Sequence, residues 1–572
     1  MIVIKGVPAS PGIAMGKAYI LEDEEIVVNR VEIAKERIRI EVKRFKQALD
    51  ATNRDLDQAE SKVLKTLGKE HAKLIDTHRL ILSDPLITKD VPRRILAESV
   101  NAEFALSEAL DAVNETFEKI EDEFFRERRH DLFDVGKRLL SHLLKQEKRS
   151  LAEVDNPCIL IARNLLPSDT VNLKESKILG FATDLGGRTS HTAILAQGMQ
   201  IPAVVGLSDA SHRVKMDDFI ILDGEHGMLI INPSPEAIAK YQKAQVKTQQ
   251  EEKALEALRG QPAVTLDGRR FEMAVNLDTA EDIKTVMGLR VDGIGLFRSE
   301  YLFMNRLEPP SEEEQYRAYL HAVKSLAPLP VVIRTADIGG DRLAQLGIDG
   351  PKNETNPFMG LRGIRLFLRH SDLLKTQLRA ILRTAQHGKV RVLLPMISSM
   401  AELRSARRIF FAVQQELLAE GNEAAKKVEL GIMVEIPSAG LILDHLLGEA
   451  DFISIGTNDL IQYVLAVDRI NEHVAHLYDP FHPAVVRILH QIVETARSKG
   501  KRVTVCGEMT SDPKAVPLLV GLGVDTLSVT PRMFLRVKQI VMSLRYENAA
   551  KLVARALTLA DSDEIQRLLT DL

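Results

Sequence analysis

The stretch Asp184-Leu-Gly-Gly-Arg-Thr-Ser-His191-Thr-Ala-Ile-Leu-Ala196 has the pattern of a strand that turns into a helix. The apolar run before this stretch, residues 178–182, predicts a buried strand. Gly186 and Gly187 within the stretch permit a tight turn with unusual backbone angles. A threonine or serine just ahead of the histidine can cap a helix whose apolar face begins at residues 192–196. The pattern therefore places His191 in the first turn of a helix.

That position suits a histidine that carries a phosphoryl group. Free backbone N–H groups and the positive end of the helix dipole disfavour a protonated ring and attract an anion. A neutral imidazole there can act as a nucleophile that accepts and holds phosphorus. The alternative is an ordinary helix-capping sequence with an incidental histidine, and the second half of the chain has to decide between the two.

Composition excludes several classes of protein. A chain of 572 residues is too long for one core, so we expect two to four domains. Hydrophobic residues make up 45% and charged residues 27%, which is typical of soluble globular proteins, and the net charge of −4 offers no footprint for nucleic acid or an anionic membrane. The N-terminus lacks the pattern of a signal peptide, and no apolar run approaches the ~18 residues that span a bilayer. Because the two cysteines, Cys158 and Cys506, are far apart, we predict no disulfide or zinc framework and expect a cytoplasmic protein.

Two kinds of sequence alternate in the N-terminal half. Two strand-like pieces lie near the N-terminus, Ile2–Ile4 and Gly16–Leu21, and strand-like sequence appears again at Pro157–Ala162. From about Val31 to Lys148 there is almost no Gly or Pro, and apolar side chains recur at helical spacing. A helical bundle inserted into a β/α domain explains this order, and a polar, Ala/Glu/Lys/Gln-rich run after it predicts a linker helix. The predicted divisions are a β/α domain over 1–24 and 149–232, a helical insert over 25–148 and a linker helix over 233–261.

The remaining residues, 262–572, alternate eight strand candidates with helical stretches. The candidates are apolar along most of their length, as parallel strands buried on both faces are. Eight β/α units predict a TIM barrel, with an open parallel sheet as the weaker alternative. The candidate strands are Phe271–Leu277, Gly293–Phe297, Val331–Thr335, Val390–Ile397, Gly431–Ile436, Phe452–Ile455, Val503–Cys506 and Thr526–Val529.

Charged and polar residues gather at the C-terminal ends of these strands, where a TIM barrel carries its chemistry. Arginines there can bind phosphate and carboxylate groups bidentately. Glu435 and Asp459 offer the hard oxygen ligands that suit Mg²⁺ when a substrate phosphate supplies more. Each arginine alone could be a structural ion-pair partner, but together they favour a phosphorylated carboxylate as ligand. The candidates are Arg298, Glu300, Arg334, Asp337, Glu435, Asn458, Asp459, Cys506 and Glu508, joined by Arg362 and Arg469.

Cys506 ends the predicted strand Val503–Cys506. A lone cysteine in a buried strand usually packs as a small hydrophobic side chain. Its place at a strand end beside a glycine favours a functional role instead. Apolar surroundings would keep the thiol protonated, so that it could donate a proton rather than attack.

Several longer motifs resemble those of one known family. The stretch Gly186-Gly-Arg-Thr-Ser-His191-Thr resembles the phosphohistidine signature of the phosphoenolpyruvate-utilising enzymes. With the helical insert before the histidine, the match covers essentially the whole chain and resembles the enzyme I family of the bacterial sugar phosphotransferase system. The barrel motifs that carry the resemblance are Asp292–Tyr301, Ile333–Asp341, Gly431–Pro437, Phe452–Tyr463 and Val505–Glu508.

The resemblance implies a mechanism and a set of partners. The Nε2 atom of His191 would attack the phosphorus of phosphoenolpyruvate in line, pyruvate enolate would leave, and Cys506 would protonate the enolate carbon. Phosphohistidine would then donate to a histidine of the carrier protein HPr, docked on the helical insert, after a swivel near residues 235–260. The family also implies a dimer through the barrel half. The resemblance assigns Mg²⁺ to Glu435 and Asp459, the substrate phosphate to Arg298, Arg334, Asn458 and Arg469, and a ring hydrogen bond to Thr170.

The sequence departs from the family pattern at two places. Arg342 stands where the family usually has lysine, and residues 528–534 form an unusual end to the barrel. Three alternatives stay open: an enzyme like pyruvate phosphate dikinase or phosphoenolpyruvate synthase, the nitrogen-related paralogue with another carrier, and a regulatory protein with a retired barrel. The first would need a large ATP-binding domain and the second an additional sensory domain, and neither is expected from this sequence. The full set of strand-end residues argues against the third.

Overall fold

The computed structural model describes residues 1–21, 28–66, 78–79, 81–118, 135–144, 156–165, 177–186, 196, 201–279, 282–304, 306–340, 343, 346–350, 354–471 and 473–570. Three residues singled out above, Thr170, His191 and Arg342, lie outside these ranges. The chain divides into two compact units, Met1–Gln249 and Gln250–Leu572. The finer domain boundaries given above stay predictions.

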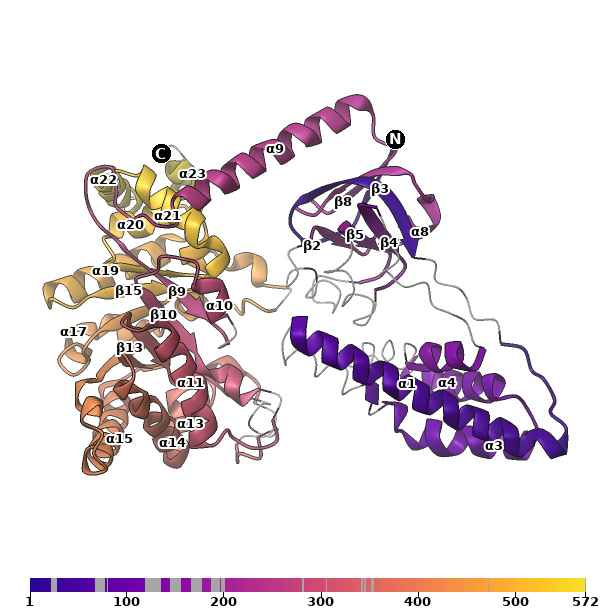
Figure 1. The fold of residues 1–572 in the computed structure, drawn as a ribbon. Helices are drawn as coiled ribbons and strands as arrows, with labels where there is room; N and C mark the ends of the chain where they lie inside the picture. The colour runs from indigo at the N-terminus through magenta and orange to yellow at the C-terminus, as the bar shows by residue number, and fades with distance from the viewer. Residues whose placement is uncertain are drawn as a thin grey trace. The chain divides into compact units, whose positions relative to one another are not determined.

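An eight-stranded sheet forms the centre of the first unit (Figure 1). Its strand order is β1-β8-β7-β3-β4-β5-β6-β2, with parallel pairing from β3 to β6 and antiparallel pairing elsewhere. All five residues of β4 are buried, as expected for a strand with both faces covered. The strands are β1 Ile2–Lys5, β2 Val7–Ser10, β3 Ile13–Leu21, β4 Cys158–Ala162, β5 Ile178–Thr183, β6 Ala203–Val205, β7 Phe219–Asp223 and β8 Met228–Ile231.

Strand β5 leads directly into the histidine stretch, as predicted. After it, the buried Asp184 accepts hydrogen bonds from the backbone N–H of Ser211, at 3.0 Å, and from the hydroxyl of the same residue. Gly186 adopts φ of +112°, a conformation that favours glycine. The N–H of Asp184 also donates to the carbonyl of Ala162 in β4, at 3.1 Å, so the chain is tied to the sheet and turned sharply just before the predicted helix. The predicted position of His191 itself falls outside the described residues.

A set of amphipathic helices lies between β3 and β4 in the sequence, which confirms the predicted helical insertion into an α/β fold. Their apolar faces form one buried cluster that includes Phe45, Leu56, Ile95 and Leu106. The elements are η1 Lys35–Arg37, α1 Ile38–Thr66, the π-helical turn η2 Leu86–Asp90, α3 Val91–Glu98, α4 Ala102–Glu118 and a helical segment over 135–144. Two helices complete the first unit's described elements, α8 Ala210–Arg213 and the first part of α9 Pro235–Ala257.

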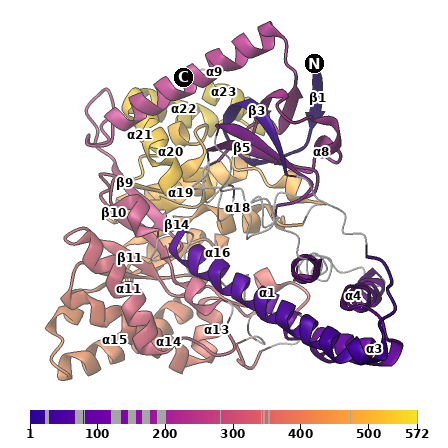
Figure 2. The same cartoon turned by 45° about the vertical axis from the view of Figure 1, so that its right-hand side comes forward.

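The second unit contains a closed barrel of eight parallel strands, which confirms the predicted TIM barrel over the open sheet (Figures 1 and 2). Closure is made by β16 pairing with β9, with Thr526 opposite Glu272. Every predicted barrel strand is present, with ends that differ by at most a few residues. The strands are β9 Glu272–Leu277, β10 Gly293–Arg298, β11 Val331–Arg334, β12 Val390–Leu394, β13 Glu429–Val434, β14 Ile453–Gly456, β15 Val503–Cys506 and β16 Thr526–Val529.

Helices surround these strands (Figure 2). Two of them begin with a full capping box, Ser311 with Glu314 at α11 and Ser399 with Glu402 at α15, which fixes where they start. Their apolar faces share one large buried cluster with the outward sides of the strands. The helices are α10 Ile283–Val286, α11 Glu312–Leu326, α13 Ile364–Arg369, α14 Ser371–Arg383, α15 Met400–Ala419, α16 Pro437–Leu441, α17 Leu443–Leu446, α18 Thr457–Leu465, α19 Pro483–Ser498, α20 Val516–Leu522, α21 Phe534–Ser543, α22 Tyr546–Ala556 and α23 Ser562–Thr570.

A second, smaller cluster fills the inside of the barrel. It consists of Leu296, Val332, Leu393, Met433, Phe452 and Cys506. The unusual segment 528–534 completes the wall of the barrel. The hydroxyl of Ser528 donates to Oδ1 of Asn276 at 2.6 Å, and the Asn276 amide donates to the carbonyl of Ser528 at 3.2 Å. Pro531–Met533 then forms the short helix η10. The barrel interior is thus filled by side chains, which form the bottom of any binding site at the strand ends. No helix in the described ranges combines the length and apolar character needed to cross a membrane.

Candidate active site

One pocket collects the predicted site residues of the barrel. It has a volume of about 240 Å³ and lies at the C-terminal ends of the strands. Its walls come from most of the barrel strands, which explains how residues far apart in sequence meet. All of the predicted residues line it: Arg298, Glu300, Arg334, Asp337, Arg362, Glu435, Asn458, Asp459, Arg469, Cys506 and Glu508.

Arg334, the last residue of β11, lies at the buried centre of this pocket. Its Nη2 donates to the carboxylate of Glu300, and its Nη1 lies 3.7 Å from Oδ2 of Asp337. Burial alone would lower the pKa of the guanidinium, but the surrounding carboxylates of Glu300, Asp337, Glu435 and Asp459 outweigh it and raise that pKa above its ordinary value. Arg334 is therefore a permanent cation, and its Nε has no hydrogen-bond partner.

Arg362 is fixed by a two-point ion pair with Asp337. Its Nε and Nη2 donate to the two carboxylate oxygens at 3.0 and 2.6 Å. The same Nη2 also reaches Oδ2 of Asp459 at 3.3 Å, and Nη1 donates to the hydroxyl of Tyr463 at 3.3 Å. The guanidinium thus links the strand end after β11 to helix α18, which carries Asp459.

Glu435 and Asp459 form the pair of carboxylates that the sequence suggests for a cation. Glu435 is buried and its Oε1 accepts from the backbone N–H of Met396 at 2.6 Å. Burial, with the nearby charges of Asp459 and Asp337, raises the pKa of Glu435 to about 8. Gly456 makes room for this side chain, because a Cβ there would lie 2.8 Å from the second oxygen of Glu435.

The donor set fits a hard divalent cation that takes further ligands from substrate and water. Oδ1 of Asp459 is buried and has no hydrogen-bond partner, which is costly unless something binds it. The described residues contain no group of three or more acidic, histidine or cysteine side chains that could hold a metal by themselves. Mg²⁺ is commonly held by one or two carboxylates together with substrate phosphate and water, so two carboxylates are sufficient for it.

The remaining polar residues lie nearer the rim. Arg298 pairs with Asp278 at 3.0 Å. Asn458 and Glu508 bind one another twice, from the Asn458 amide to Oε1 at 3.1 Å and from the Glu508 backbone N–H to Oδ1 at 2.8 Å. Arg469 lies 3.6 Å from the same carboxylate and keeps a buried Nε without a hydrogen-bond partner.

Cys506 lies on the floor of the pocket and is 1% exposed. Its Sγ lies 3.4 Å from the hydroxyl of Ser454 and 3.4 Å from the carbonyl of Ile455. Burial raises the pKa of this thiol. The group is therefore neutral near pH 7 and is a potential proton donor rather than a nucleophile.

The balance of charge in the pocket favours a bound cation. Four arginines face five carboxyl groups there, and each arginine already has an acidic partner. An anionic substrate entering alone would meet the carboxylate of Asp459, whereas the raised pKa of Glu435 keeps that group neutral near pH 7. A divalent cation held by the two residues would favour the ionised form of Glu435 and would attract the anion. The charged lining residues are Arg298, Arg334, Arg362 and Arg469 against Glu300, Asp337, Glu435, Asp459 and Glu508.

Sequence reasoning missed several residues that shape the site. Met433 lines the pocket, and its Sδ lies 3.6 Å from Nη1 of Arg334. It stands two residues before Glu435, so strand alternation places both on the same side. Tyr463, four residues after Asp459 on helix α18, shares a helix face with it and donates to the carbonyl of Phe358. Periodicity counted from the acidic residues would have found both.

Comparison with known proteins gives one consistent result. Family profiles described as PEP-utilising enzyme match three ranges: the N-terminal domain over residues 5–128, the mobile domain over 154–227 and the PEP-binding domain over 252–546. The Phosphoenolpyruvate-protein phosphotransferase of Bacillus sp. (strain S) is 40% identical over 98% of this chain and 96% of its own length. That of Listeria monocytogenes is 39% identical over 99% and 98%.

Among solved structures, the solution structure of Enzyme I (nEIt) is 39% identical and covers 43% of this chain and 99% of its own, with a TM-score of 0.38. The full-length sequence matches and the three family profiles show that the chain belongs to the PEP-utilising enzymes, within the phosphoenolpyruvate-protein phosphotransferase (enzyme I) family.

Proposed function

We propose that this chain transfers the phosphoryl group of phosphoenolpyruvate to His191, releases pyruvate, and passes the phosphoryl group on to a histidine of the carrier HPr. The observation that carries the proposal is the convergence of nine predicted strand-end residues, together with Arg362 and Arg469, on one pocket. The relatives, which match nearly the whole chain, are named for this reaction. An enzyme that uses phosphoenolpyruvate as its phosphoryl donor is expected in the cytoplasm.

The substrate carries a phosphate and a carboxylate on the same carbon atom, and the pocket offers cations for both. Arg334 and Arg362 are buried and held in place by acidic partners, so they suit the phosphoryl group, whose charge changes during the reaction. Arg298 and Arg469 are about 28% and 29% exposed, with Asn458 beside Arg469, and can reach an entering anion. Positioning and neutralisation of charge are the main contributions that a protein makes to phosphoryl transfer.

Glu435 and Asp459 would hold Mg²⁺. Bound there, the cation would neutralise phosphate charge and fix the orientation of the phosphoryl group. The buried, unpartnered Oδ1 of Asp459 supports this assignment.

The transfer itself needs one nucleophile and one acid. Nε2 of His191 attacks phosphorus, the bond from phosphorus to the enol oxygen breaks, and its electron pair stays on pyruvate enolate. The Sγ–H of Cys506 gives its proton to the methylene carbon of the enolate, which becomes the methyl group of pyruvate. The thiolate then regains a proton from solvent. The floor position of Cys506 and its raised pKa support this role.

Acid-labile labelling tests the central step. The purified chain is mixed with [³²P]phosphoenolpyruvate and Mg²⁺, and the label is mapped, while pyruvate release is followed in parallel. We expect label on His191 and its loss in His191→Ala, with the exposed His212→Ala as the matched control. Label on another residue, or pyruvate release that survives His191→Ala, would contradict the proposal.

The histidine and the barrel pocket belong to different units, and the boundary between these units along the chain falls within helix α9. We therefore propose a swivel in the region 235–260 that brings His191 alternately to the substrate and to HPr on the helical insert. A cross-link between the units should suppress at least one half-reaction, and two half-reactions at full rate would overturn this. Sedimentation of the full chain tests the proposed dimer through the barrel half.

A further inference from the structure

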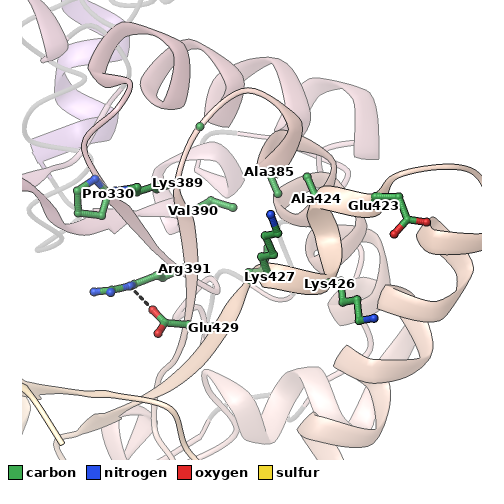
Figure 3. Close-up of a pocket in the computed structure, with 12 residues that line it drawn as sticks. Pro330, Ala385, Lys389, Val390, Arg391, Glu423, Ala424, Lys426, Lys427 and Glu429 are labelled. Atoms are coloured by element: carbon green, nitrogen blue, oxygen red, sulfur yellow. Dashed lines mark ion pairs between the residues drawn. The ribbon is translucent and has the colours of Figure 1, made fainter.

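A second cavity lies at the other end of the barrel, away from the candidate active site. Its volume is about 730 Å³. Because parallel strands all run in one direction, the N-terminal ends that line this cavity are opposite to the catalytic ends. Its walls come from Pro330 before β11, residues 388–391 at the start of β12, and residues 423–429, which include the short helix η7 Glu423–Lys427 and the start of β13 (Figure 3).

The lining of this cavity is rich in cations that lack acidic partners. Lys389, Lys426 and Lys427 are exposed, and in the described part of the chain no carboxylate lies within ion-pair distance of them. The fourth cation, Arg391, pairs with Glu429 at 2.5 Å. Among the described residues, one further acidic side chain, Glu423, lines the cavity, so three lysines without an ion pair there stand against one such carboxylate.

These lysines project from backbone that is held in place. The carbonyl of Lys389 accepts from the N–H of Val331 within the barrel sheet, at 2.9 Å. Lys426 and Lys427 follow Ala425, whose carbonyl accepts from the buried Gln414 at 2.8 Å and whose N–H donates to Asn422 at 3.3 Å. Figure 3 shows Lys427 directed towards Ala385 across the cavity. The backbone that carries the cations is therefore preformed, and only the exposed lysine side chains have to be ordered when a ligand binds.

We propose that this cavity binds a small molecule carrying at least two anionic groups, phosphate or carboxylate. Its volume is that of a metabolite site, which lies within roughly 300–1,000 Å³. Lysine ammonium groups bind such groups as compact point charges, and several are needed for a multiply charged ligand. The limited volume of the cavity and the chain's net charge of −4 favour a small anion over an extended acidic polymer.

Pyridoxal 5′-phosphate is a suitable probe, because it combines a phosphate with an aldehyde that forms an imine with a nearby lysine. Borohydride reduces the imine to a stable amine, and mass spectrometry then identifies the labelled residue. No lysine among the described residues lines the candidate active site, and mass spectrometry assigns each label to its residue, so the two pockets are told apart. The exposed lysines Lys284 and Lys551 of the same unit serve as references.

We expect limiting pyridoxal phosphate to label Lys389, Lys426 or Lys427 several-fold faster than the references. Tripolyphosphate or citrate should protect these lysines and leave the references unchanged, with less protection at high salt. His191→Ala should not alter the pattern, which separates this site from the proposed phosphotransfer. In Lys389→Gln/Lys427→Gln, labelling of Lys426 should fall to the reference rate.

Equal labelling of cavity and reference lysines would overturn the proposal. So would protection by hexaglutamate alone, since that would indicate an acidic peptide surface. The labelling rates and their protection by tripolyphosphate are measured first on the unaltered chain. These measurements test the proposal even if the double variant does not fold.

Discussion

Asp337 binds Arg362 through both of its carboxylate oxygens, at 3.0 and 2.6 Å. The same carboxylate lies 3.7 Å from Arg334, and its side chain is only 2% exposed. Two of the arginines that suit the substrate phosphate therefore share one buried acidic partner. This partner positions both guanidinium groups without itself being suited to bind an anion.

The variant Asp337→Asn should weaken catalysis through this positioning role. The amide keeps the shape but removes the charge and one acceptor, so both arginines lose their fixed orientation. We expect kcat/KM for phosphoenolpyruvate to fall about 10- to 100-fold, which corresponds to about 1.4–2.8 kcal/mol. Steady-state pyruvate release measures it, with the exposed Asp444→Asn as control. An unchanged kcat/KM would show that Asp337 is not needed to hold the arginines.

Metal binding can be tested separately from turnover in a His191→Ala background. There phosphoenolpyruvate can bind without reacting, and free Mn²⁺ is followed by electron paramagnetic resonance. We expect Glu435→Gln and Asp459→Asn each to weaken Mn²⁺ binding at least about tenfold, because each removes one of only two carboxylate ligands. The exposed Glu494→Gln should leave binding unchanged. Equal affinities in all variants would place the cation elsewhere.

The thiol of Cys506 should be unreactive at mildly alkaline pH. Its pKa is raised by burial, so the neutral form persists as pH rises past about 8.5, the ordinary value for a free cysteine. Since only the thiolate is alkylated, iodoacetamide should modify Cys506 at pH 8 at least about tenfold more slowly than it modifies a free thiol. Pyruvate release should decline only when pH rises through the raised pKa and the proton needed for the enolate is lost. Rapid alkylation of the folded chain at pH 8 would contradict this.

Much of the barrel could be predicted from sequence because its strands are buried on both faces and therefore read as apolar runs. The strand β2 was not predicted. Pro8 lies in it, and proline is compatible with a strand only where no ladder hydrogen bond is needed. β2 is the edge strand of its sheet, so this condition is met, but an edge position is a property of the assembled sheet.

The candidate site, too, could be predicted from sequence only in part. Strand ends in a parallel barrel meet at one face, so the identity of the residues that gather there follows from sequence alone. Which carboxylate pairs with which arginine does not follow, because it depends on side-chain rotamers and on the loops after each strand. The sharing of Asp337 between Arg334 and Arg362, and the contact of Tyr463 with Arg362, are of this kind.

Gly507, directly after Cys506, offers a last test with a matched control in the same unit. Its φ is +106°, and a Cβ there would collide with the hydroxyl of Thr457 and lie 2.9 Å from Oδ1 of Asn458. Gly500 also has a positive φ, +65°, but its added Cβ would meet nothing within 4 Å. Gly500→Ala should therefore cost only the backbone strain of about 1–2 kcal/mol in the free energy of unfolding, with pyruvate release unchanged. Gly507→Ala carries that strain as well and also displaces Asn458 from its place beside the pocket, so kcat/KM should fall together with stability. Equal activities of the two alanine variants would show that the collision relaxes without moving the site.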